Sequence, residues 1–351
     1  MEKLRKAVSE IAYTQNHAKL THLQLSLIPV LHFASSLYKL AHSLHRSLYH
    51  YGLFRKHRLP VPVISVGNLT WGGNGKTPMA EFIALFLADS GISPLILTRG
   101  YAGGDEAKML HMHLLGRPKV GGHFSSEKIG AVILDDGMQH WSLQRDLEIV
   151  MVSGLTLWGN CHLIPCGPLR EPFNALRRGD VVVLHHADLL SEQDLKDIDL
   201  MLQQVNKSLP IFFTKMDPCY FFDVGNFIHR RILWAPLISL LLSLRYHLIF
   251  RFFDMRFLSC AMSFFEPNDD IEMIRRRLRE LEDTFGHKPV VIVTEKDYDR
   301  DPEIFKHLDP YEVLALCSEL KIIPHRECTE DGFKKLLKGD LKDELQGTYR
   351  N

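Results

Sequence analysis

A glycine-rich stretch between residues 61 and 79, VPVISVGNLTWGGNGKTPM, has the composition of a phosphate-binding loop. It closes with Gly75-Lys76-Thr77, as the P-loop pattern G-x-x-x-x-G-K-[ST] does, but Thr70 stands where that pattern has its first glycine. A P-loop binds phosphates with backbone N–H groups, reaches the β- and γ-phosphates with its lysine and ligates Mg²⁺ with its threonine. The stretch therefore predicts a nucleotide and Mg²⁺ site, with a tight strand-to-helix turn as the alternative. The candidate nucleotide-binding residues are Gly72, Gly73, Asn74, Gly75, Lys76 and Thr77, and Thr77 is also a candidate metal ligand.

Two adjacent carboxylates, Asp135 and Asp136, end the apolar run AVILDD. A strand that ends in aspartate is where a P-loop enzyme holds its magnesium, directly or through water. Neighbouring carboxylates repel each other unless a cation or a proton is shared between them. We therefore expect Asp135 and Asp136 at the metal and phosphate end of the site; the alternative is a solvated acidic turn.

A third candidate is the loop RGYAGGDEAKML, residues 99–110. Gly103 and Gly104 predict a mobile loop after a strand, and Asp105 and Glu106 are carboxylates that could act there as a general base. An ordinary surface loop has the same composition.

The elements around these residues predict an α/β fold. Short apolar runs alternate with helix-like segments, which is typical of a parallel, doubly wound sheet covered on both faces. A helix is expected over residues 76–91, directly after the P-loop. The expected strands are 61–66, 94–98, 131–136, 148–152, 180–186, 210–214, 289–294 and 311–317.

Composition sets limits on the function. The 351 residues are 46% apolar, enough for a sizeable core, and Lys+Arg and Asp+Glu number 42 each, so no overall positive charge attracts nucleic acid. The six cysteines are widely spaced, which indicates a reducing compartment. The run CHLIPC, residues 161–166, could begin a zinc site or contain ordinary loop cysteines, and no second pair of ligands follows it.

The N-terminal segment differs in character from the rest. Apolar residues between Leu23 and Leu48 recur at the spacing of an amphipathic helix, with a basic side and no acidic residue between Glu10 and Glu81. No run of 18 apolar residues exists, so a spanning helix is not expected. The helix either packs on the protein or lies in a membrane interface. Glu2 and Glu10 speak against an organellar transit peptide, since such peptides are poor in acidic residues.

These features predict an N-terminal segment with an amphipathic helix (1–58), a P-loop domain (59–215) and a smaller C-terminal α/β domain (216–351). Residues 231–265 interrupt the pattern, because they are rich in Leu, Phe and Arg without clear strand or turn signals. We interpret them as a buried or interfacial helix.

Several motifs in order resemble the tetraacyldisaccharide 4'-kinases of lipid A biosynthesis, and plant members in particular. They are VPVISVGNLTWGGNGKTP, LTRGY, GDE, ILDDGMQHWSLQRDLEIVMV, GNCHLIPCGPLREP and VTEKDYDRD. The resemblance covers about residues 23–188 and 270–323, and the Thr70 form of the P-loop is the family's own version.

The resemblance implies a membrane-associated kinase that transfers the γ-phosphoryl group of ATP, with Mg²⁺, to the 4'-hydroxyl of tetraacyldisaccharide 1-phosphate, an acylated glucosamine disaccharide. The product is lipid IVA. It implies peripheral membrane attachment through the N-terminal helix, in mitochondria for a plant-like member or at the bacterial inner membrane otherwise. We expect a monomer without a nucleic-acid partner.

The resemblance also assigns roles to residues. Lys76 and Thr77 correspond to the P-loop lysine and the magnesium threonine, and Asp135 and Asp136 to the aspartates that serve Mg²⁺ and the transfer step. Asp105 corresponds to the aspartate that activates the sugar hydroxyl. Residues with expected roles in positioning substrate or phosphate are Gln139, His140, Arg170 and Glu171.

Two regions depart from the family pattern. Only about 16 residues separate GDEAKML from EKIGAVILDD, where the family has several tens. No Asp-His-His motif precedes VTEKD, although a histidine of that motif partners the activating aspartate in the family. The alternative function is therefore a catalytically impaired member that binds ATP or lipid without phosphoryl transfer.

Overall fold

The computed structural model describes residues 2–14, 20–98, 129–224 and 267–348, which fall into two compact units. The first unit comprises the described residues before 99, those from 129 to 215 and those from 320 onward. The second comprises the described residues between 216 and 319. The C-terminal helix α10 (Glu330–Thr348) thus groups with the first unit and not with the smaller C-terminal domain expected from the sequence.

Within the described residues, eight strands form a sheet in the order β2-β3-β1-β4-β5-β6-β8-β7. The pairs on either side of β1 are parallel, and Val66 of β1 lies beside Asp135 of β3 and Ile149 of β4. This register brings the carboxyl ends of β1 and β3 to the same edge, where ligands bind in open α/β sheets. The strands are β1 (Val63–Asn68), β2 (Pro94–Leu97), β3 (Ala131–Asp135), β4 (Leu147–Ser153), β5 (Val181–His185), β6 (Ile211–Asp223), β7 (Val291–Thr294) and β8 (Val313–Ile323).

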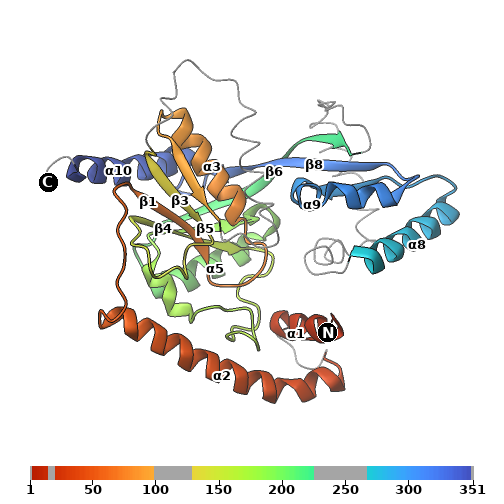
Figure 1. Cartoon of the computed structure of the whole chain (residues 1–351), viewed down its shortest axis with the longest axis horizontal. Coiled ribbons are helices and arrows are strands. Elements are labelled where there is room, and N and C mark those ends of the chain that lie inside the picture. The colour runs from red at the N-terminus through yellow and green to blue at the C-terminus, as the bar shows by residue number, and fades with distance from the viewer. Residues whose placement is uncertain (1, 15–19, 99–128, 225–266, 349–351) are drawn as a thin grey trace. The chain divides into compact units, whose positions relative to one another are not determined.

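The central strands are continuous apolar runs because both of their faces are covered. Every residue of β1, β3, β4 and β5 is buried. The helix α3 (Lys76–Asp89) connects β1 to β2, whereas α5 (Glu192–Val205) connects β5 to β6 in the opposite direction along the sheet. Right-handed crossovers in opposite directions place the two helices on opposite faces, as Figure 1 shows. The predicted α/β, doubly wound architecture is therefore confirmed.

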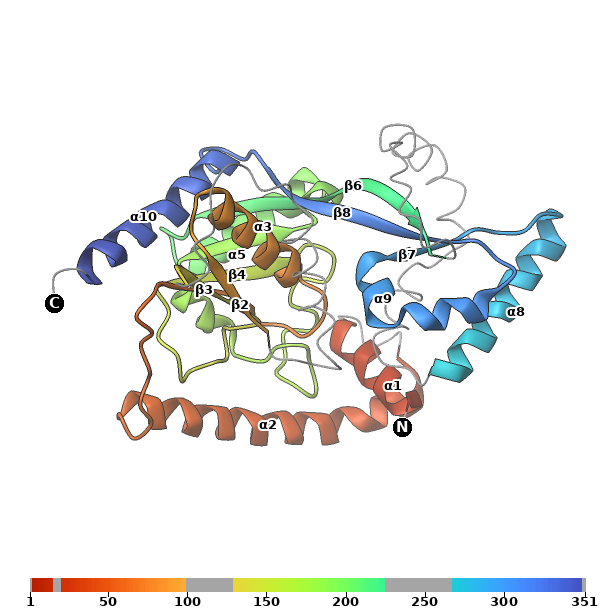
Figure 2. The same ribbon diagram turned by 45° about the horizontal axis from the view of Figure 1, so that its top comes forward.

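The N-terminal segment forms two helices, α1 (Glu2–Tyr13) and α2 (His22–His50). Thr21 and Gln24 form a capping box that starts α2. Both views show α2 outside the sheet and its covering helices, next to loop segments (Figures 1 and 2). It is attached by polar contacts: Ser35 Oγ donates to the carbonyl of Leu163, 2.8 Å away, and accepts a hydrogen bond from the N–H of Cys166, 3.0 Å away.

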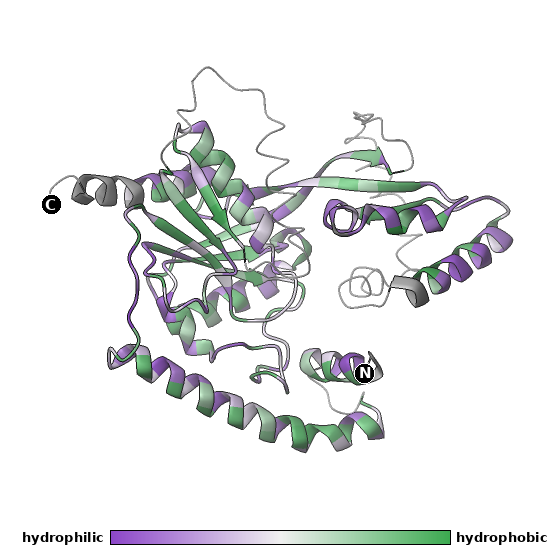
Figure 3. Cartoon of the chain, in the orientation of Figure 1, coloured by the Kyte–Doolittle hydropathy of each residue, from purple (hydrophilic) through white to green (hydrophobic). Residues whose placement is uncertain are grey.

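The exposed face of α2 is apolar. Residues Leu23, Val30, Phe33, Leu37, Leu40 and Leu44 are 53–68% exposed, and they recur at three-, four- and seven-residue spacing. Figure 3 shows apolar residues along the whole length of α2. An ordinary surface helix buries its apolar face against the protein core. In α2 the side chains that contact the rest of the protein include a serine, a tyrosine and a histidine instead. Among the described helices, none has the length and apolarity that a bilayer span requires.

The second unit has its own core. The helix α8 (Pro267–Phe285) contributes Ile271 and Leu278, which pack with Phe222 of β6 and with Phe305 and Leu308. The last two belong to a short 3₁₀ helix, η5 (Pro302–Leu308), which follows α9 (Glu295–Arg300). The expected strands near 291 and 313 are both present here. The segment 231–265, interpreted as a helix, lies outside the described residues.

Phe333 explains why α10 returns to the first unit. Its side chain is fully buried, 6.0 Å from the ring of Phe82 on α3 and 5.0 Å from that of Phe212 on β6. Three residues that are distant in sequence thus form one aromatic cluster. The hydrophobic periodicity of residues 216–351 does not predict this contact, because two of the three residues lie outside that range.

We expect Phe333→Ala to lower the free energy of unfolding by about 3–5 kcal/mol, because it removes a fully buried ring from a packed cluster. Phe33→Ala is the matched control, since Phe33 is 67% exposed and its loss leaves no cavity. Urea unfolding followed by circular dichroism measures both changes, and equal losses for the two variants would contradict the packing of α10 described here.

Candidate active site

The P-loop joins the end of β1 to the first residue of α3. Gly75 precedes the helix with φ +77° and Gly72 has φ +99°, both in the left-handed region that glycine adopts without strain. The helix begins at Lys76, so its first N–H groups, which lack intrahelical partners, lie next to the loop. This arrangement is that of a phosphate-binding loop at a helix N-terminus.

Thr70 has a structural task in this loop. Its hydroxyl accepts a hydrogen bond from Asn74 Nδ2 at 3.0 Å, and both side chains are buried. Asn74 is thereby held across the loop from Thr70. Thr70, which departs from the common P-loop pattern, therefore stabilises the loop through this internal hydrogen bond.

Thr77 and Asp135 meet at the carboxyl edge of the sheet. Thr77 Oγ1 donates to Asp135 Oδ2 at 2.9 Å, and both side chains are buried. The two oxygen-bearing groups come from α3 and β3, and the parallel register of β1 and β3 brings these elements together. A hydroxyl and a carboxylate are oxygen ligands of the kind that Mg²⁺ prefers.

Asp136 lies between two cations. Arg170 Nη1 donates to both carboxylate oxygens at 2.7 and 2.8 Å, and Lys76 Nζ is 3.6 Å from Oδ1. Asp136 has φ +62°, a conformation that aspartate tolerates better than most residues, and this turns the chain out of β3. The predicted catalytic residues Lys76 and Asp136 therefore lie side by side.

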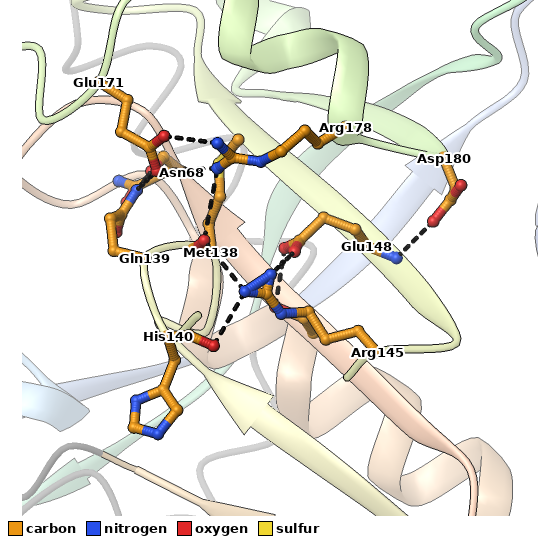
Figure 4. Close-up of polar contacts among 10 residues, drawn as sticks. Asn68, Met138, Gln139, His140, Arg145, Glu148, Glu171, Arg178 and Asp180 are labelled. Atoms are coloured by element: carbon orange, nitrogen blue, oxygen red, sulfur yellow. Dashed lines mark hydrogen bonds and ion pairs between the residues drawn. The ribbon is translucent and has the colours of Figure 1, made fainter. Parts of the chain in front are cut away.

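Gln139 and Glu171 form the next layer. Gln139 Nε2 donates to the carbonyl of Asn68 at 2.9 Å and to Glu171 Oε1 at 3.2 Å, while its Oε1 accepts from Arg170 at 3.3 Å. Glu171 is fully buried and accepts two hydrogen bonds from Arg178, at 2.7 and 2.8 Å (Figure 4). The structure thus connects the predicted positioning residues Gln139, Arg170 and Glu171 through direct contacts.

The charge state of Glu171 follows from its neighbours. Burial alone would raise its pKa, but His42 and Arg178 outweigh burial and lower the pKa to about 2. His42 Nε2, on α2, lies 3.4 Å from Glu171 Oε2. Glu171 is therefore ionised, and it ties α2 to the site.

Among the predicted positioning residues, His140 stands apart from this group. The imidazole of His140 is exposed and points away from Gln139 and Glu171 in Figure 4, whereas its backbone N–H donates to the carbonyl of Gly137 and its carbonyl accepts from Arg145. Asp105 lies outside the described residues. Cys161 and Cys166 are both free thiols, and no cluster of three or more His, Cys, Asp or Glu able to hold a metal exists within the described chain.

The family was identified by comparison with known proteins. The family model described as tetraacyldisaccharide-1-P 4'-kinase (LpxK) matches residues 27–121 and 104–226. A probable mitochondrial tetraacyldisaccharide 4'-kinase of Arabidopsis thaliana is 50% identical over 387 aligned positions, which cover 96% of this chain and 97% of the relative. The chain belongs to the tetraacyldisaccharide 4'-kinase family.

Bacterial relatives match a shorter part of the chain. The tetraacyldisaccharide 4'-kinase of Desulfotalea psychrophila is 38% identical over 209 positions, 51% of this chain and 60% of that protein. A crystal structure of LpxK from Aquifex aeolicus in complex with ATP has a TM-score of 0.50 at 23% identity and covers 91% of this chain and 99% of that one. This likeness supports the fold.

The comparisons also show that this chain is shorter than its plant relative in part of the aligned region. The alignment with the Arabidopsis kinase has more positions than this chain has residues, so the relative carries residues without a counterpart here. The family model matches the chain in two pieces that meet within residues 104–121.

The structure adds residues of the kinase family motifs to which the sequence analysis gave no role. Arg145 Nη1 donates to Glu148 at 2.9 Å, and its Nη2 donates to the carbonyls of Met138 at 3.3 Å and His140 at 3.0 Å (Figure 4). Ser65 Oγ donates to the other oxygen of Glu148 at 2.7 Å. Arg145 thereby fixes the turn that carries Gln139. The signal available in the sequence was Glu148, a carboxylate inside an apolar strand, because such residues are rarely buried without a partner.

His185 is a second addition. Its buried ring lies against Gly75, and its Nδ1 is 3.0 Å from Thr214 Oγ1. Burial, and then the neighbouring His186, lowers the pKa of His185 to about 3, so the ring is neutral. A neutral ring packs against the P-loop without adding charge to the candidate phosphate site.

We expect Gly75→Ala to damage the P-loop. The new Cβ would lie 2.5 Å from Cδ2 of the buried His185 ring, and φ +77° disfavours alanine, so the loop must shift at a cost of about 1–3 kcal/mol. Gly73→Ala is the control within the same loop, since no heavy atom lies within 4 Å of its added Cβ. Thermal unfolding and ATP titration calorimetry should show larger losses for Gly75→Ala, and equal effects would count against the loop geometry.

We expect the stabilising effect of Glu148 to depend on pH. Burial raises its pKa to about 7, above the unfolded value near 4.5, despite the opposing effects of Arg145 and Ser65. Its contribution is therefore fullest below pH 4.5 and is lost as the pH rises through 7. The free energy of unfolding of wild type minus that of Glu148→Gln should fall by up to roughly 3 kcal/mol between pH 5 and 8.

Urea unfolding at four pH values measures this difference. Glu192→Gln, at an exposed position of α5, is the control and should give a difference that does not vary with pH. A constant difference for Glu148→Gln as well would mean that the buried carboxyl is already ionised at pH 5.

Proposed function

We propose that this protein transfers the γ-phosphoryl group of ATP to the 4'-hydroxyl of tetraacyldisaccharide 1-phosphate and releases lipid IVA and ADP. The observation that carries the proposal is the arrangement of Lys76, Asp136 and Arg170 beside the P-loop, in a chain that belongs to the kinase family. Phosphoryl transfer needs positioning and charge stabilisation more than covalent chemistry. Lys76 and Arg170, which both contact Asp136 beside the P-loop, would supply the positioning and the positive charge.

The nucleotide end is proposed to use the loop residues Gly72–Thr77. Their backbone N–H groups bind phosphate oxygens, and Lys76 binds the phosphate that is transferred. The buried hydroxyl of Thr77 and carboxylate of Asp135, 2.9 Å apart, fit Mg²⁺ by the chemistry of their oxygens. Mg²⁺ bound there would neutralise charge on the phosphates.

The acceptor end is proposed to depend on Asp105 as general base. Asp105 takes the proton of the 4'-hydroxyl, the new oxygen–phosphorus bond forms and the bond to the β-phosphate oxygen breaks, so that ADP leaves. Arg170 and Gln139 orient Asp136 and the substrate, and Glu171 holds Gln139 in place. We assign a role in positioning the substrate to His140 as well, because it directly follows Gln139 in the motif ILDDGMQH.

The proposed place of action is a membrane surface. The exposed apolar face of α2 and the absence of acidic residues from 11 to 80 match a helix that lies in a lipid interface, where the acylated substrate is found. The plant relative is named as mitochondrial, so we propose peripheral attachment to a mitochondrial membrane, as a monomer.

A second candidate function is a family member that binds ATP or lipid without transferring phosphate. The observations that favour it are the missing Asp-His-His motif and the residues that this chain lacks relative to the plant kinase. The P-loop, Asp135 and Asp136 are present in both cases, so only turnover separates the two functions.

Turnover is measured with radiolabelled ATP and tetraacyldisaccharide 1-phosphate in detergent micelles. We expect Lys76→Ala to lower kcat by about 10²-fold or more, because it removes a fixed charge at the phosphate that is transferred. Asp105→Ala should also lower kcat, and Lys196→Ala, at an exposed position of α5, should leave it unchanged. If wild type binds ATP yet turns over no faster than Lys76→Ala, the kinase function is wrong and the binding function stands.

A further inference from the structure

A small hollow opens at the C-terminal end of α2, within the first unit. Its volume is about 140 Å³, and it is lined by Arg46, Tyr49, His50, Lys56, Trp141 and Arg178. We call these residues the basic hollow. Arg46, Lys56 and Arg178 are outside the groups proposed to bind nucleotide and to transfer phosphate.

Trp141 organises the cations around it. The Arg178 guanidinium carbon lies 4.2 Å from the centre of the Trp141 ring, Lys56 Nζ lies 5.7 Å from it, and the ring of Tyr49 stacks at 6.3 Å. Cation–π contacts of this kind hold charged groups beside a ring. The Nη donors of Arg178 are already bonded to Glu171, so the donors that a ligand could use come from Arg46 and Lys56. The basic hollow therefore has an aromatic wall with donors along its rim.

The basic hollow carries a surplus of positive charge. Arg178 is neutralised by Glu171, but among the described residues no carboxylate pairs with Arg46 or Lys56. The sequence supplies none locally, because residues 11–80 contain no Asp or Glu. Two cations and a histidine around one hollow fit a dianionic group, and arginine and lysine are the side chains that bind phosphate.

The position of the basic hollow limits which phosphate it can serve. On one side, Arg178 contacts Glu171, which contacts Gln139, which contacts Arg170 beside Asp136. On the other side, the exposed apolar face of α2 ends at Leu44, two residues before Arg46. A ligand of this region is anionic, lies close to acyl chains and reaches toward the P-loop.

The geometry points to the basic hollow as the binding site for the phosphate at position 1 of the disaccharide. This assignment rests on the proposed function, since the family acts on a 1-phosphate and transfers phosphate to the distant 4' position. A phosphate on a bilayer lipid has the same chemistry. The shared residue Arg178, which also holds the active-site carboxylate Glu171, favours the substrate over a bulk headgroup.

The test uses Arg46→Gln with Lys56→Gln, two exposed positions, in the full chain. Substrates are the tetraacyldisaccharide 1-phosphate and the same disaccharide without its 1-phosphate, in micelles of a neutral detergent. We expect KM for the phosphorylated substrate to rise tenfold or more with kcat within about twofold of wild type, because charge-assisted hydrogen bonds to the phosphate are lost. For the substrate without phosphate, wild type and variant should have equal kcat/KM within about twofold.

Lys196→Gln with Lys207→Gln removes the same charge from exposed positions in and after α5 and should change neither parameter. An unchanged KM in the Arg46/Lys56 variant, or an equal loss with both substrates, would overturn the assignment. A loss that appears only when anionic phospholipid is added to the micelles would assign the basic hollow to membrane headgroups instead.

Binding without ATP separates this assignment from the proposed function. Wild type should retain the phosphorylated disaccharide in micelles at least tenfold more tightly than the form without phosphate, and the Arg46/Lys56 variant should lose that preference. If wild type shows the preference but no turnover, the kinase function fails while the basic hollow stands. If wild type shows turnover without the preference, the basic hollow fails alone.

Discussion

A carboxylate with no exposed surface, Glu171, constrains the rest of the site. Burying an ionised group costs several kcal/mol unless its charge and its lone pairs are matched. Arg178, Gln139 and His42 supply that match, from η3 (Phe173–Arg178), the turn after β3, and α2. The need to pair one charge therefore brings together three segments that are far apart in the sequence.

The same constraint explains the order of the neighbouring contacts. Gln139 donates to Glu171 with its amide nitrogen and to the carbonyl of Asn68 at the end of β1, which leaves its oxygen to accept from Arg170. The contact between Arg170 and this amide oxygen helps to orient Arg170 toward Asp136. The buried charge of Glu171 thus sets the direction of a hydrogen bond next to Asp136.

Local sequence patterns predicted the parts of the fold that local physics determines. Apolar runs such as AVILD gave strands at the expected places because both sheet faces are buried. The prediction for β6 stopped at residue 214, whereas the strand continues to Asp223, because KMDPCYFFD contains Pro218 and is only half-buried in its middle. The P-loop residues and the Asp135-Asp136 pair could be predicted as parts of a candidate site because each is a continuous motif. Contacts such as His42 with Glu171, or Phe333 with Phe82, join residues more than 100 positions apart, and no periodicity encodes them.

The way α2 is attached has a consequence for adsorption to lipid. Its apolar face points outward, while Ser35 and Tyr38 bind backbone carbonyls of the protein through their hydroxyl groups. The helix is thus already formed and docked before any lipid arrives. If α2 attaches the protein to lipid as proposed, adsorption through that face is a rigid-body event, so it does not carry the ordering entropy that a disordered anchor loses when it folds on a bilayer. Desorption would likewise leave the fold unchanged, so a protein attached in this way would exchange between lipid surfaces without refolding its N-terminal segment.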